Sequence, residues 1–312
     1  MHTLRLFALL PILVLAVGCG TAERWQRIDA DHLSPPPLAR EMRGVWVATV
    51  ANIDWPSKPG LSPDEQRAEA DATLDLAQRL GLNAVILQVR PHTDALYNDA
   101  LEPWSSYLTG TQGQDPGYDP LRYWLDGARG RGIELHAWIN PFRAAHPADP
   151  SEIAPSHISN TRPDLVVSYG DYLWLDPSHP EARSHSLRVV EDILRRYDLD
   201  GIHLDDYFYP YPIDDTEFPD GERYDDYLAR GGTLDRNAWR REHINAFVRD
   251  LDSLVRRLRP DALFGISPFG IWRPGHPEGI VSFDPYEKLA ADARLWLRAG
   301  WLVYASPQLH RN

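Results

Sequence analysis

The chain has 312 residues, 43% of them hydrophobic, and includes 11 tryptophans. This composition excludes a disordered protein, because so many apolar side chains suffice to bury a core. The formal net charge of −13 argues against a nucleic-acid partner and against electrostatic docking on anionic lipid, since both need a basic surface.

The first 18 residues have the pattern of a secretory signal peptide. Arg5 supplies the positive start, and an apolar run of 12 residues extends from Leu6 to Val17, too short to span a bilayer as a helix. Cys19, the only cysteine, follows Gly18 at once. This junction resembles a bacterial lipoprotein signal, so we expect residues 1–18 to be removed and Cys19 to be lipidated. A soluble secreted protein is the alternative.

Residues 19–40 are predicted to be the lipid anchor and a proline-rich tether, because Pro35, Pro36 and Pro37 stiffen this segment. In such lipoproteins Gly20 does not signal retention in the inner membrane. We therefore expect an exported protein, anchored in the outer membrane and facing the periplasm if the cell is Gram-negative. This anchor is the only predicted membrane contact, and residues 41–312 form the predicted globular domain.

Strands and helices alternate along that domain. Six strands are predicted at 40–50, 83–91, 133–142, in the stretch 199–211, at 263–273 and at 301–309. The helices between them are predicted from Ser62 to Gly81, at 120–130, 181–197, 236–259 and 287–299, and long loops cover 92–119 and 143–179. This order predicts an α/β fold with a parallel sheet and right-handed crossovers. It resembles the (β/α)8 TIM-barrel plan, with about six β/α units present.

The stretch 199–211 (LDGIHLDDYFYPY) carries the strongest functional signal. Alternation along a strand places His203 and Asp205 on one face, and Asp206 on the other. In a parallel barrel Asp205 then stands at the C-terminal mouth, where such barrels keep their chemistry. The aromatic residues that follow suit a sugar, whose ring faces are apolar. Capping of the next element is the alternative role for Asp205 and Asp206.

Several segments carry a resemblance to a known family. They are 41–46 with 52–56, 88–91, 137–141, 200–210 and 266–273. In this order, across residues 41–309, the chain resembles the bacterial glycosyl-hydrolase-like family 10. The resemblance implies a TIM-barrel domain, often on a lipoprotein, that acts on envelope or extracellular polysaccharide. Some members look like peptidoglycan glycosidases that cut glycan strands stripped of peptides near the division site.

The family barrel continues after the strand that matches residues 301–309 with two more β/α units, whereas this sequence reaches Asn312. We therefore expect a barrel that is incomplete at the C-terminus. A sheet of six such strands does not close with the usual stagger and leaves two open edges.

Glycosidases mostly use two carboxyl groups that flank the glycosidic oxygen. Asp205 is the first candidate, and its partner is sought among Asp206, Asp54 and Glu287. The predicted hydrogen-bonding contacts to sugar hydroxyls are Arg90, Asn140, Ser267 and Gln308. The predicted stacking platforms are Trp55, Trp138, Tyr207 and Trp272, although core packing is the alternative for each tryptophan.

The leading hypothesis is a glycoside hydrolase without a cofactor or metal, acting on cell-envelope polysaccharide. A non-catalytic glycan-binding lipoprotein and an inactive fragment are the alternatives. A metal-dependent hydrolase with His136, His203 and Asp205 as ligands is a further one, although His203 is expected deeper in the barrel. The sequence has no Gly-rich phosphate loop, nucleophile elbow or HExxH motif, so nucleotide, α/β-hydrolase and zincin functions lack support.

Overall fold

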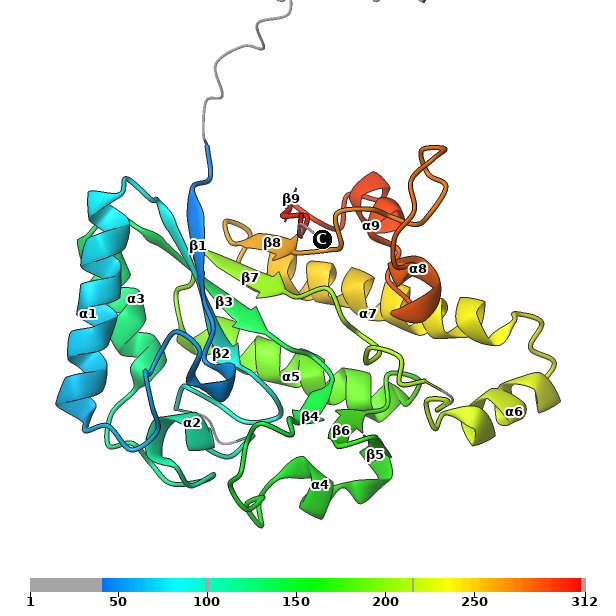
Figure 1. The fold of residues 1–312 in the computed structure, drawn as a ribbon, viewed down its shortest axis with the longest axis horizontal. Coiled ribbons are helices and arrows are strands. Elements are labelled where there is room, and N and C mark those ends of the chain that lie inside the picture. Colours follow the sequence, from blue (N-terminus) through cyan, green and yellow to red (C-terminus); the bar gives the residue numbers. More distant parts are fainter. Residues whose placement is uncertain (1–40, 99–100, 215, 310–312) are drawn as a thin grey trace, which may run out of the picture. The chain divides into compact units, whose positions relative to one another are not determined.

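A parallel sheet of six strands forms the centre of the computed structural model, which describes residues 41–98, 101–214 and 216–309 (Figure 1). The predicted signal peptide, Cys19 and the tether lie outside the described residues. Along the sheet the strands are β1 (Gly44–Val47), β2 (Ala84–Arg90), β3 (Glu134–Ile139), β7 (Gly201–Leu204), β8 (Leu263–Ile266) and β9 (Tyr304–Ala305). Their spatial order follows the chain, which confirms the predicted barrel-type α/β fold.

The sheet is curled, and its order leaves β1 and β9 as the edge strands of the described part. Every residue of β2 is buried, because the strand lies between two neighbours and both of its faces are covered. In the part of the chain that the structure describes, no helix is both long and apolar enough to cross a membrane.

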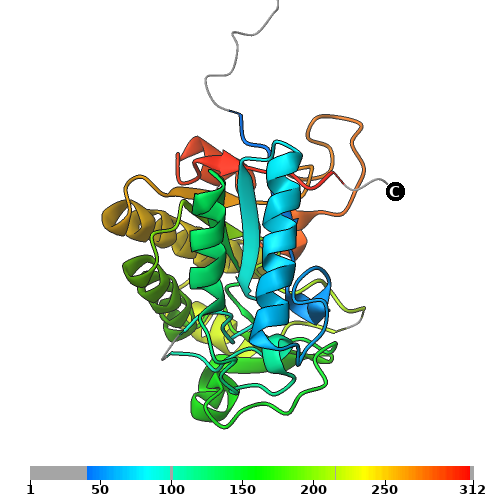
Figure 2. The same ribbon diagram turned by 90° about the vertical axis from the view of Figure 1, so that its left-hand side faces the viewer.

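Four long helices cover the outer face of the sheet: α1 (Pro63–Arg79), α3 (Pro120–Gly130), α5 (Pro180–Arg196) and α7 (Arg236–Leu258). Figure 2 shows α1 and α3 standing side by side in front of the strands. The predicted start of α1 is confirmed, since Ser62 and Glu65 form a reciprocal capping box and Pro63 takes the first helical position. The shorter helices are η2 (Val50–Asn52), α2 (Ser106–Thr109), α4 (Ile158–Thr161), η3 (Pro163–Leu165) and α6 (Gly221–Ala229).

The connection between β3 and α5, predicted as a loop, contains a small antiparallel sheet. Its strands lie in the order β4 (Arg143–Ala145), β6 (Tyr172–Leu175) and β5 (Val166–Tyr169). Trp174 of β6 faces Arg143 in register and donates from its indole to the carbonyl of Phe208, 2.9 Å away. The small sheet thereby attaches to the loop that follows β7.

The helix predicted over 287–299 is in fact two short helices, α8 (Pro285–Lys288) and α9 (Ala293–Arg298). Ala290 between them has a φ of 57°, which a continuous right-handed helix excludes, and Asp292 starts α9 as its N-cap. The last strand is also shorter than predicted. After β9 the chain touches the β8 side again through an isolated bridge between Phe269 and Gln308.

Two glycines make room for large side chains inside the curled sheet. A Cβ on Gly201 would lie 2.4 Å from Nδ1 of His136, and a Cβ on Gly265 would lie 2.1 Å from the ring of Tyr304. The absence of these Cβ atoms lets an imidazole and a phenol lie flat against the neighbouring strands.

Candidate active site

The C-terminal ends of the parallel strands surround a hollow of about 400 Å³, which we call the Asp205 pocket. Its lining comes from β1, β3, β7, β8 and the segment after β9: Trp46, Ala48, Trp138, Asp205, Ser267, Ser306, Pro307, Gln308 and Leu309. The structure therefore brings four predicted site residues together here, namely Trp138, Asp205, Ser267 and Gln308. This is the end of a parallel barrel at which catalytic residues gather.

Asp205 stands directly after β7 and is partly buried. Gln308 donates from Nε2 to Oδ1 of Asp205 over 2.9 Å. Burial and the neighbouring carboxylate of Asp206 raise the pKa of Asp205 to about 7. No arginine, lysine or histidine of the described residues lies within ion-pair distance of this carboxyl group. Asp205 consequently holds a proton near neutral pH, as a general acid requires.

Asp206 is buried and lies beside Asp205 rather than across a gap from it. Its backbone N–H donates to Oδ1 of Asp205 over 3.0 Å, and the hydroxyl of Tyr211 donates to its Oδ2 over 2.5 Å. Two carboxyl groups that flank a glycosidic bond stand about 5 Å or more apart. The contact geometry therefore suits Asp206 to hold the proton on Asp205, and not to act from the opposite face of a sugar.

A chain of hydrogen bonds lies below the Asp205 pocket. The indole of Trp46, which only donates, faces Nε2 of His203 at 3.3 Å, and the hydroxyl of Ser267 lies 2.8 Å from the same nitrogen. Nε2 is therefore the acceptor, so Nδ1–H of His203 donates to the hydroxyl of Tyr304 (2.9 Å) and that hydroxyl donates to Nδ1 of His136 (2.9 Å). Burial lowers the pKa of His203 to about 3 and that of His136 to about 4, so both rings are neutral.

These hydrogen bonds involve the two histidines, His136 and His203, that the sequence suggested as metal ligands. Tyr304 stands between His136 and His203 and bonds to both rings. Among the residues that the structure describes, no cluster of three or more histidine, cysteine, aspartate or glutamate side chains is arranged to hold a metal ion. The described geometry thus does not support the metal-dependent alternative.

Arg90 does not face a sugar, contrary to the prediction. Its guanidinium is fully buried and donates from Nε and Nη2 to both oxygens of Glu102, at 2.7 and 2.5 Å. Nη1 donates to the carbonyls of Asn140 and Pro141, and His185 lies 2.8 Å from Glu102. Burial alone would raise the pKa of Glu102, but Arg90 outweighs it and holds that pKa near 2. This group of residues is a structural ion pair at the end of β2.

Asn140 is also buried, so the prediction of a direct sugar contact is wrong in this structure. Its Nδ2 donates to the carbonyl of Pro91 over 2.9 Å, and its Oδ1 accepts from the indole of Trp138 over 3.3 Å. Asn140 therefore orients Trp138, which does line the Asp205 pocket.

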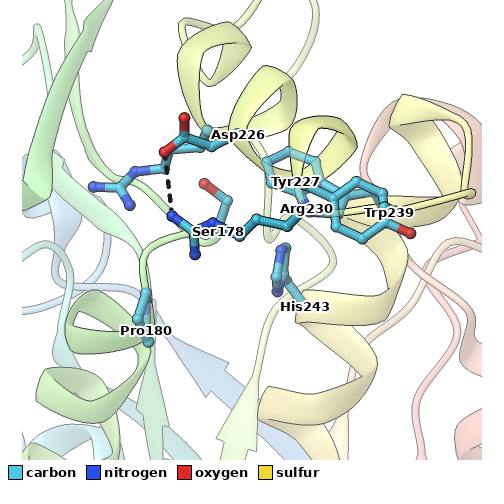
Figure 3. Close-up of a pocket in the computed structure, with 10 residues that line it drawn as sticks. Ser178, Pro180, Asp226, Tyr227, Arg230, Trp239 and His243 are labelled. Atoms are coloured by element: carbon cyan, nitrogen blue, oxygen red, sulfur yellow. Dashed lines mark hydrogen bonds and ion pairs between the residues drawn. The ribbon is translucent and has the colours of Figure 1, made fainter.

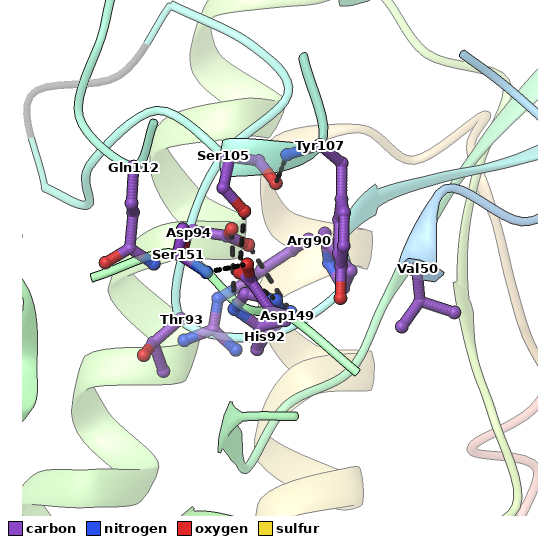
Figure 4. Close-up of polar contacts among 12 residues, drawn as sticks. Val50, Arg90, His92, Thr93, Asp94, Ser105, Tyr107, Gln112, Asp149 and Ser151 are labelled. Atoms are coloured by element: carbon purple, nitrogen blue, oxygen red, sulfur yellow. Dashed lines mark hydrogen bonds and ion pairs between the residues drawn. The ribbon is translucent and has the colours of Figure 1, made fainter. Parts of the chain in front are cut away.

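A second buried polar cluster follows β2 (Figure 4). His92 lies between two carboxyl groups, with Nδ1 3.4 Å from Asp94 and Nε2 3.7 Å from Asp149. Burial lowers the pKa of His92 to about 3 and raises that of Asp94 to about 7. Both the imidazole and the Asp94 carboxyl group are therefore neutral between about pH 3 and pH 7, which reduces the cost of burying them.

Two predicted stacking platforms lie elsewhere. Trp55 is 1% exposed, packs edge-to-face on Trp124 at 5.3 Å between centroids, and donates to the carbonyl of Gln66. Trp272 donates to Asp292 at the start of α9 over 3.0 Å, and lines a hollow beside that helix instead of the Asp205 pocket. Core packing explains the first tryptophan, and attachment of α9 explains the second.

The other two candidate carboxylates are outside the pocket lining as well. Asp54 is exposed and accepts from the backbone N–H of Ala48 over 2.8 Å, so it caps the end of β1 at the rim. Glu287 lies in α8, accepts from Arg241 at 3.1 Å and faces Arg273 at 3.4 Å. Its charge is balanced there by two guanidinium groups.

Tyr207, the remaining predicted platform, lines a separate hollow that we call the aromatic cavity. This cavity has a volume of about 170 Å³ and is lined by Arg143, Tyr172, Trp174, Tyr207, Pro210 and Tyr211. Nη1 of Arg143 donates to the hydroxyl of Tyr207 over 2.8 Å. Tyr211, which bonds to Asp206, joins the cavity wall to the carboxyl pair.

A hollow of about 420 Å³ lies at the junction of α5, α6 and α7 (Figure 3). Figure 3 shows Tyr227 and Trp239 on one side of it and the ion pair of Asp226 with Arg230 on another. The two charged groups of this pair are 3.4 Å apart. Its lining includes neither Asp205 nor any residue of the central strands. Volume therefore does not identify the site, whereas the position at the strand ends does.

Sequence reasoning missed Trp46, Arg143 and Glu102. A signal existed for Trp46, because alternation along β1 puts it on the same face as Ala48. Arg143 and Glu102 had none, since both lie in connections without a repeating pattern.

The curled parallel sheet, with polar and aromatic side chains at its C-terminal ends, defines a protein of the glycoside-hydrolase type of (β/α) barrel. An α-L-fucosidase isoenzyme of Paenibacillus thiaminolyticus shares this fold, with a TM-score of 0.52 at 12% identity over 76% of this chain and 34% of that one. Glycosyl hydrolase YngK of Bacillus subtilis is 42% identical over 277 residues, which cover 87% of this chain and 54% of YngK.

Glycosyl hydrolase DigH of Escherichia coli K12 is 33% identical over 97% of this chain and 74% of DigH. Residues 41–312 match the family described as Glycosyl hydrolase-like 10. The protein belongs to this family, which confirms the resemblance found in the sequence. The chain spans about half the length of YngK and about three quarters of DigH.

Proposed function

We propose that this protein hydrolyses glycosidic bonds of a cell-envelope polysaccharide, with Asp205 as the proton donor. The observation that carries the proposal is a carboxyl group at the mouth of the parallel sheet with a pKa of about 7. Glycosidases need one carboxyl group that stays protonated at the working pH. The names of YngK and DigH, both glycosyl hydrolases, support the same reaction class.

In the proposed reaction the protonated Asp205 donates to the glycosidic oxygen while the bond from the anomeric carbon to that oxygen breaks. The anomeric carbon takes up the oxygen of a water molecule, directly or after a covalent intermediate with a carboxylate, and the proton of that water passes to a carboxylate. Asp206 keeps the proton on Asp205 until then, and Gln308 orients the carboxyl group through its 2.9 Å hydrogen bond. Trp46 and Trp138 line the same pocket and offer apolar faces to sugar rings. Among the lining residues that the structure describes, Asp205 is the only carboxylate, so the second one comes from outside that lining.

The proposed substrate is a glycan of the envelope, with peptidoglycan strands stripped of their peptides as the specific candidate. This choice follows the family resemblance and the predicted lipoprotein signal at Cys19, which would hold the domain at the outer membrane on the periplasmic side. No cofactor is required by the proposed reaction.

The test incubates the full chain with purified peptide-free glycan strands and follows released fragments by mass spectrometry. Asp205→Asn is expected to lower the rate roughly 100- to 10,000-fold, since general acid catalysis supplies such factors. Asp250→Asn is the matched control, because that carboxylate is 52% exposed and pairs with the neighbouring Arg249. Equal rates for wild type and Asp205→Asn would overturn the assignment.

The single carboxylate in the described lining favours one second candidate, a non-catalytic glycan-binding protein. Binding of the same strands without turnover, equal for wild type and Asp205→Asn, would select that function. Turnover by the wild type would reject it.

A further inference from the structure

Arg143 is a buried cation that forms no direct ion pair, although its charge also acts on the more distant carboxyl group of Asp205. Its side chain is nearly inaccessible, donates from Nε to the carbonyl of Pro91 over 2.9 Å, and donates from Nη1 to the hydroxyl of Tyr207 over 2.8 Å. Its Nη2 has no hydrogen-bond partner. No carboxylate of the described residues lies within ion-pair distance of this guanidinium.

Other buried arginines of the described chain are neutralised. Arg90 meets Glu102 at 2.5 Å, and Arg241 meets Glu287 at 3.1 Å. Burying an unpaired charge costs far more than burying a paired one. A guanidinium that is desolvated in advance and left with an unused N–H is therefore a pre-formed site for an anion.

Arg143 and Tyr207, which carry these unused donors, both line the aromatic cavity. The hydroxyl of Tyr207 accepts from Arg143, so its own hydrogen remains to be donated. Nη2–H and this O–H together offer two donors to one anion. Burial keeps the pKa of Tyr207 above its usual range, so the hydroxyl stays protonated.

We propose that the aromatic cavity binds a carboxylate carried by a sugar of the substrate, with Arg143 and Tyr207 as its donors. This inference rests on the proposed glycosidase function and assigns it an acidic glycan. The cavity of about 170 Å³ holds roughly five or six waters at about 30 Å³ each, enough for a carboxylate on a short alkyl branch. Tyr172, Trp174 and Pro210 supply the apolar walls that such a branch needs.

The cavity lies close to the candidate proton donor. Tyr207 follows Asp205 by two positions, and Tyr211 of the cavity wall donates to Asp206. A sugar with its carboxylate in the cavity is thereby placed beside the Asp205 pocket. Arg143 acts as a binding residue that selects the substrate, and takes no part in the bond cleavage.

Binding is tested with short peptide-free peptidoglycan oligomers, whose muramic acid residues carry a free lactyl carboxylate. The matched ligand is the same oligomers with these carboxylates converted to methylamides. Calorimetry uses the full chain with Asp205→Asn, so that no turnover interferes. We expect the acidic oligomers to bind at least tenfold more tightly than the amides, as hydrogen bonds to a charged group predict.

Arg143→Met is expected to bind both ligands equally weakly, and Arg195→Gln, an exposed arginine of α5, to keep the tenfold preference. A preference that survives in Arg143→Met would overturn the inference. Wild-type turnover of acidic and amidated strands at equal rates would overturn it too, while leaving the glycosidase proposal intact. If no form binds or cleaves either ligand, the proposed function itself fails.

The stability of Arg143→Met gives an independent readout. Pro91 keeps its bond from Asn140 in this variant, and Tyr207 faces the cavity, so the substitution leaves no orphaned buried group. We expect its unfolding temperature to match or exceed that of the wild type, because an unpaired buried charge is removed. A large loss of stability would show that Arg143 is structural. Arg143→Lys keeps the positive charge but loses the planar guanidinium with its paired N–H donors. This variant is expected to retain a reduced preference for the acidic ligand.

Discussion

Two carboxyl groups near the C-terminal ends of the strands have pKa values shifted in opposite directions. Glu102 is buried against Arg90 and His185, and the arginine holds its pKa near 2 despite the burial. Asp205 is partly buried beside another carboxylate, Asp206, and its pKa rises to about 7. Both groups are desolvated at the same edge of the sheet. The presence of a countercharge, and not burial by itself, therefore decides whether a carboxyl group stays ionised in a structural ion pair or holds a proton that it can donate.

Removing the countercharge of Glu102 should have the largest effect on stability. Arg90→Met leaves the Glu102 carboxyl group buried without its main countercharge, so we expect the free energy of unfolding to fall by about 3–5 kcal/mol. Urea denaturation measures it. In the control Arg131→Met the arginine pairs with Asp71 and Asp75, which are about half exposed, and the expected loss is below about 1 kcal/mol. Similar losses in the two variants would contradict the role given to burial.

Asp205→Asn should stabilise the protein at alkaline pH. The folded-state pKa of Asp205 lies above its unfolded value, so the folded state binds more protons between about pH 4 and pH 7, and wild-type stability falls as pH rises through this range. The amide is neutral throughout. We expect a gain on the order of 2 kcal/mol at pH 8 and almost none at pH 4, measured by thermal unfolding. A gain that does not depend on pH would refute the assigned pKa.

The pH dependence of activity should report the same proton. Cleavage requires protonated Asp205, so kcat/KM of the wild type should fall above pH 7, about tenfold per pH unit. The rate is measured with saturating and limiting glycan between pH 5 and pH 9. Circular dichroism over this range serves as the control for unfolding. A rate that keeps rising to pH 9 would exclude Asp205 as the acid.

The smallest expected effect separates the two causes of the raised pKa. Asp206→Asn removes the neighbouring charge but keeps the burial, so the alkaline limb of the pH–rate profile should move down by about one pH unit. Asp54→Asn, on the rim but bonded to Ala48 rather than to Asp205, should not move it. An unshifted limb in Asp206→Asn would assign the whole shift to burial.

Periodicity and end signals were enough to predict much of the fold. The capping box at Ser62, the buried run of β2 and the alternation around Asp205 are local patterns, and each lies where the sequence predicts it. The same alternation predicts that Trp138, Ser267 and Gln308 lie with Asp205 at the strand ends, and the structure places them there. Residue-to-residue spacing encodes these features, because parallel strands bring equivalent positions together.

The identity of the groups that neutralise a buried side chain depends on contacts distant in the sequence. Arg90 and Asn140 have the pattern of site residues, yet Glu102 from a loop and Pro91 occupy their donors. Trp55 has the sequence pattern of a stacking platform, yet Trp124 of α3 covers it.

The sequence by itself thus determined the order of the strands, the helices that cover them and the position of Asp205 at a strand end. Only the tertiary structure decided which polar groups are paired and which are left with unused donors, as Arg143 is. The physical reason is that local spacing sets the face on which a side chain lies, whereas its charge balance is set by whatever the folded chain packs against it.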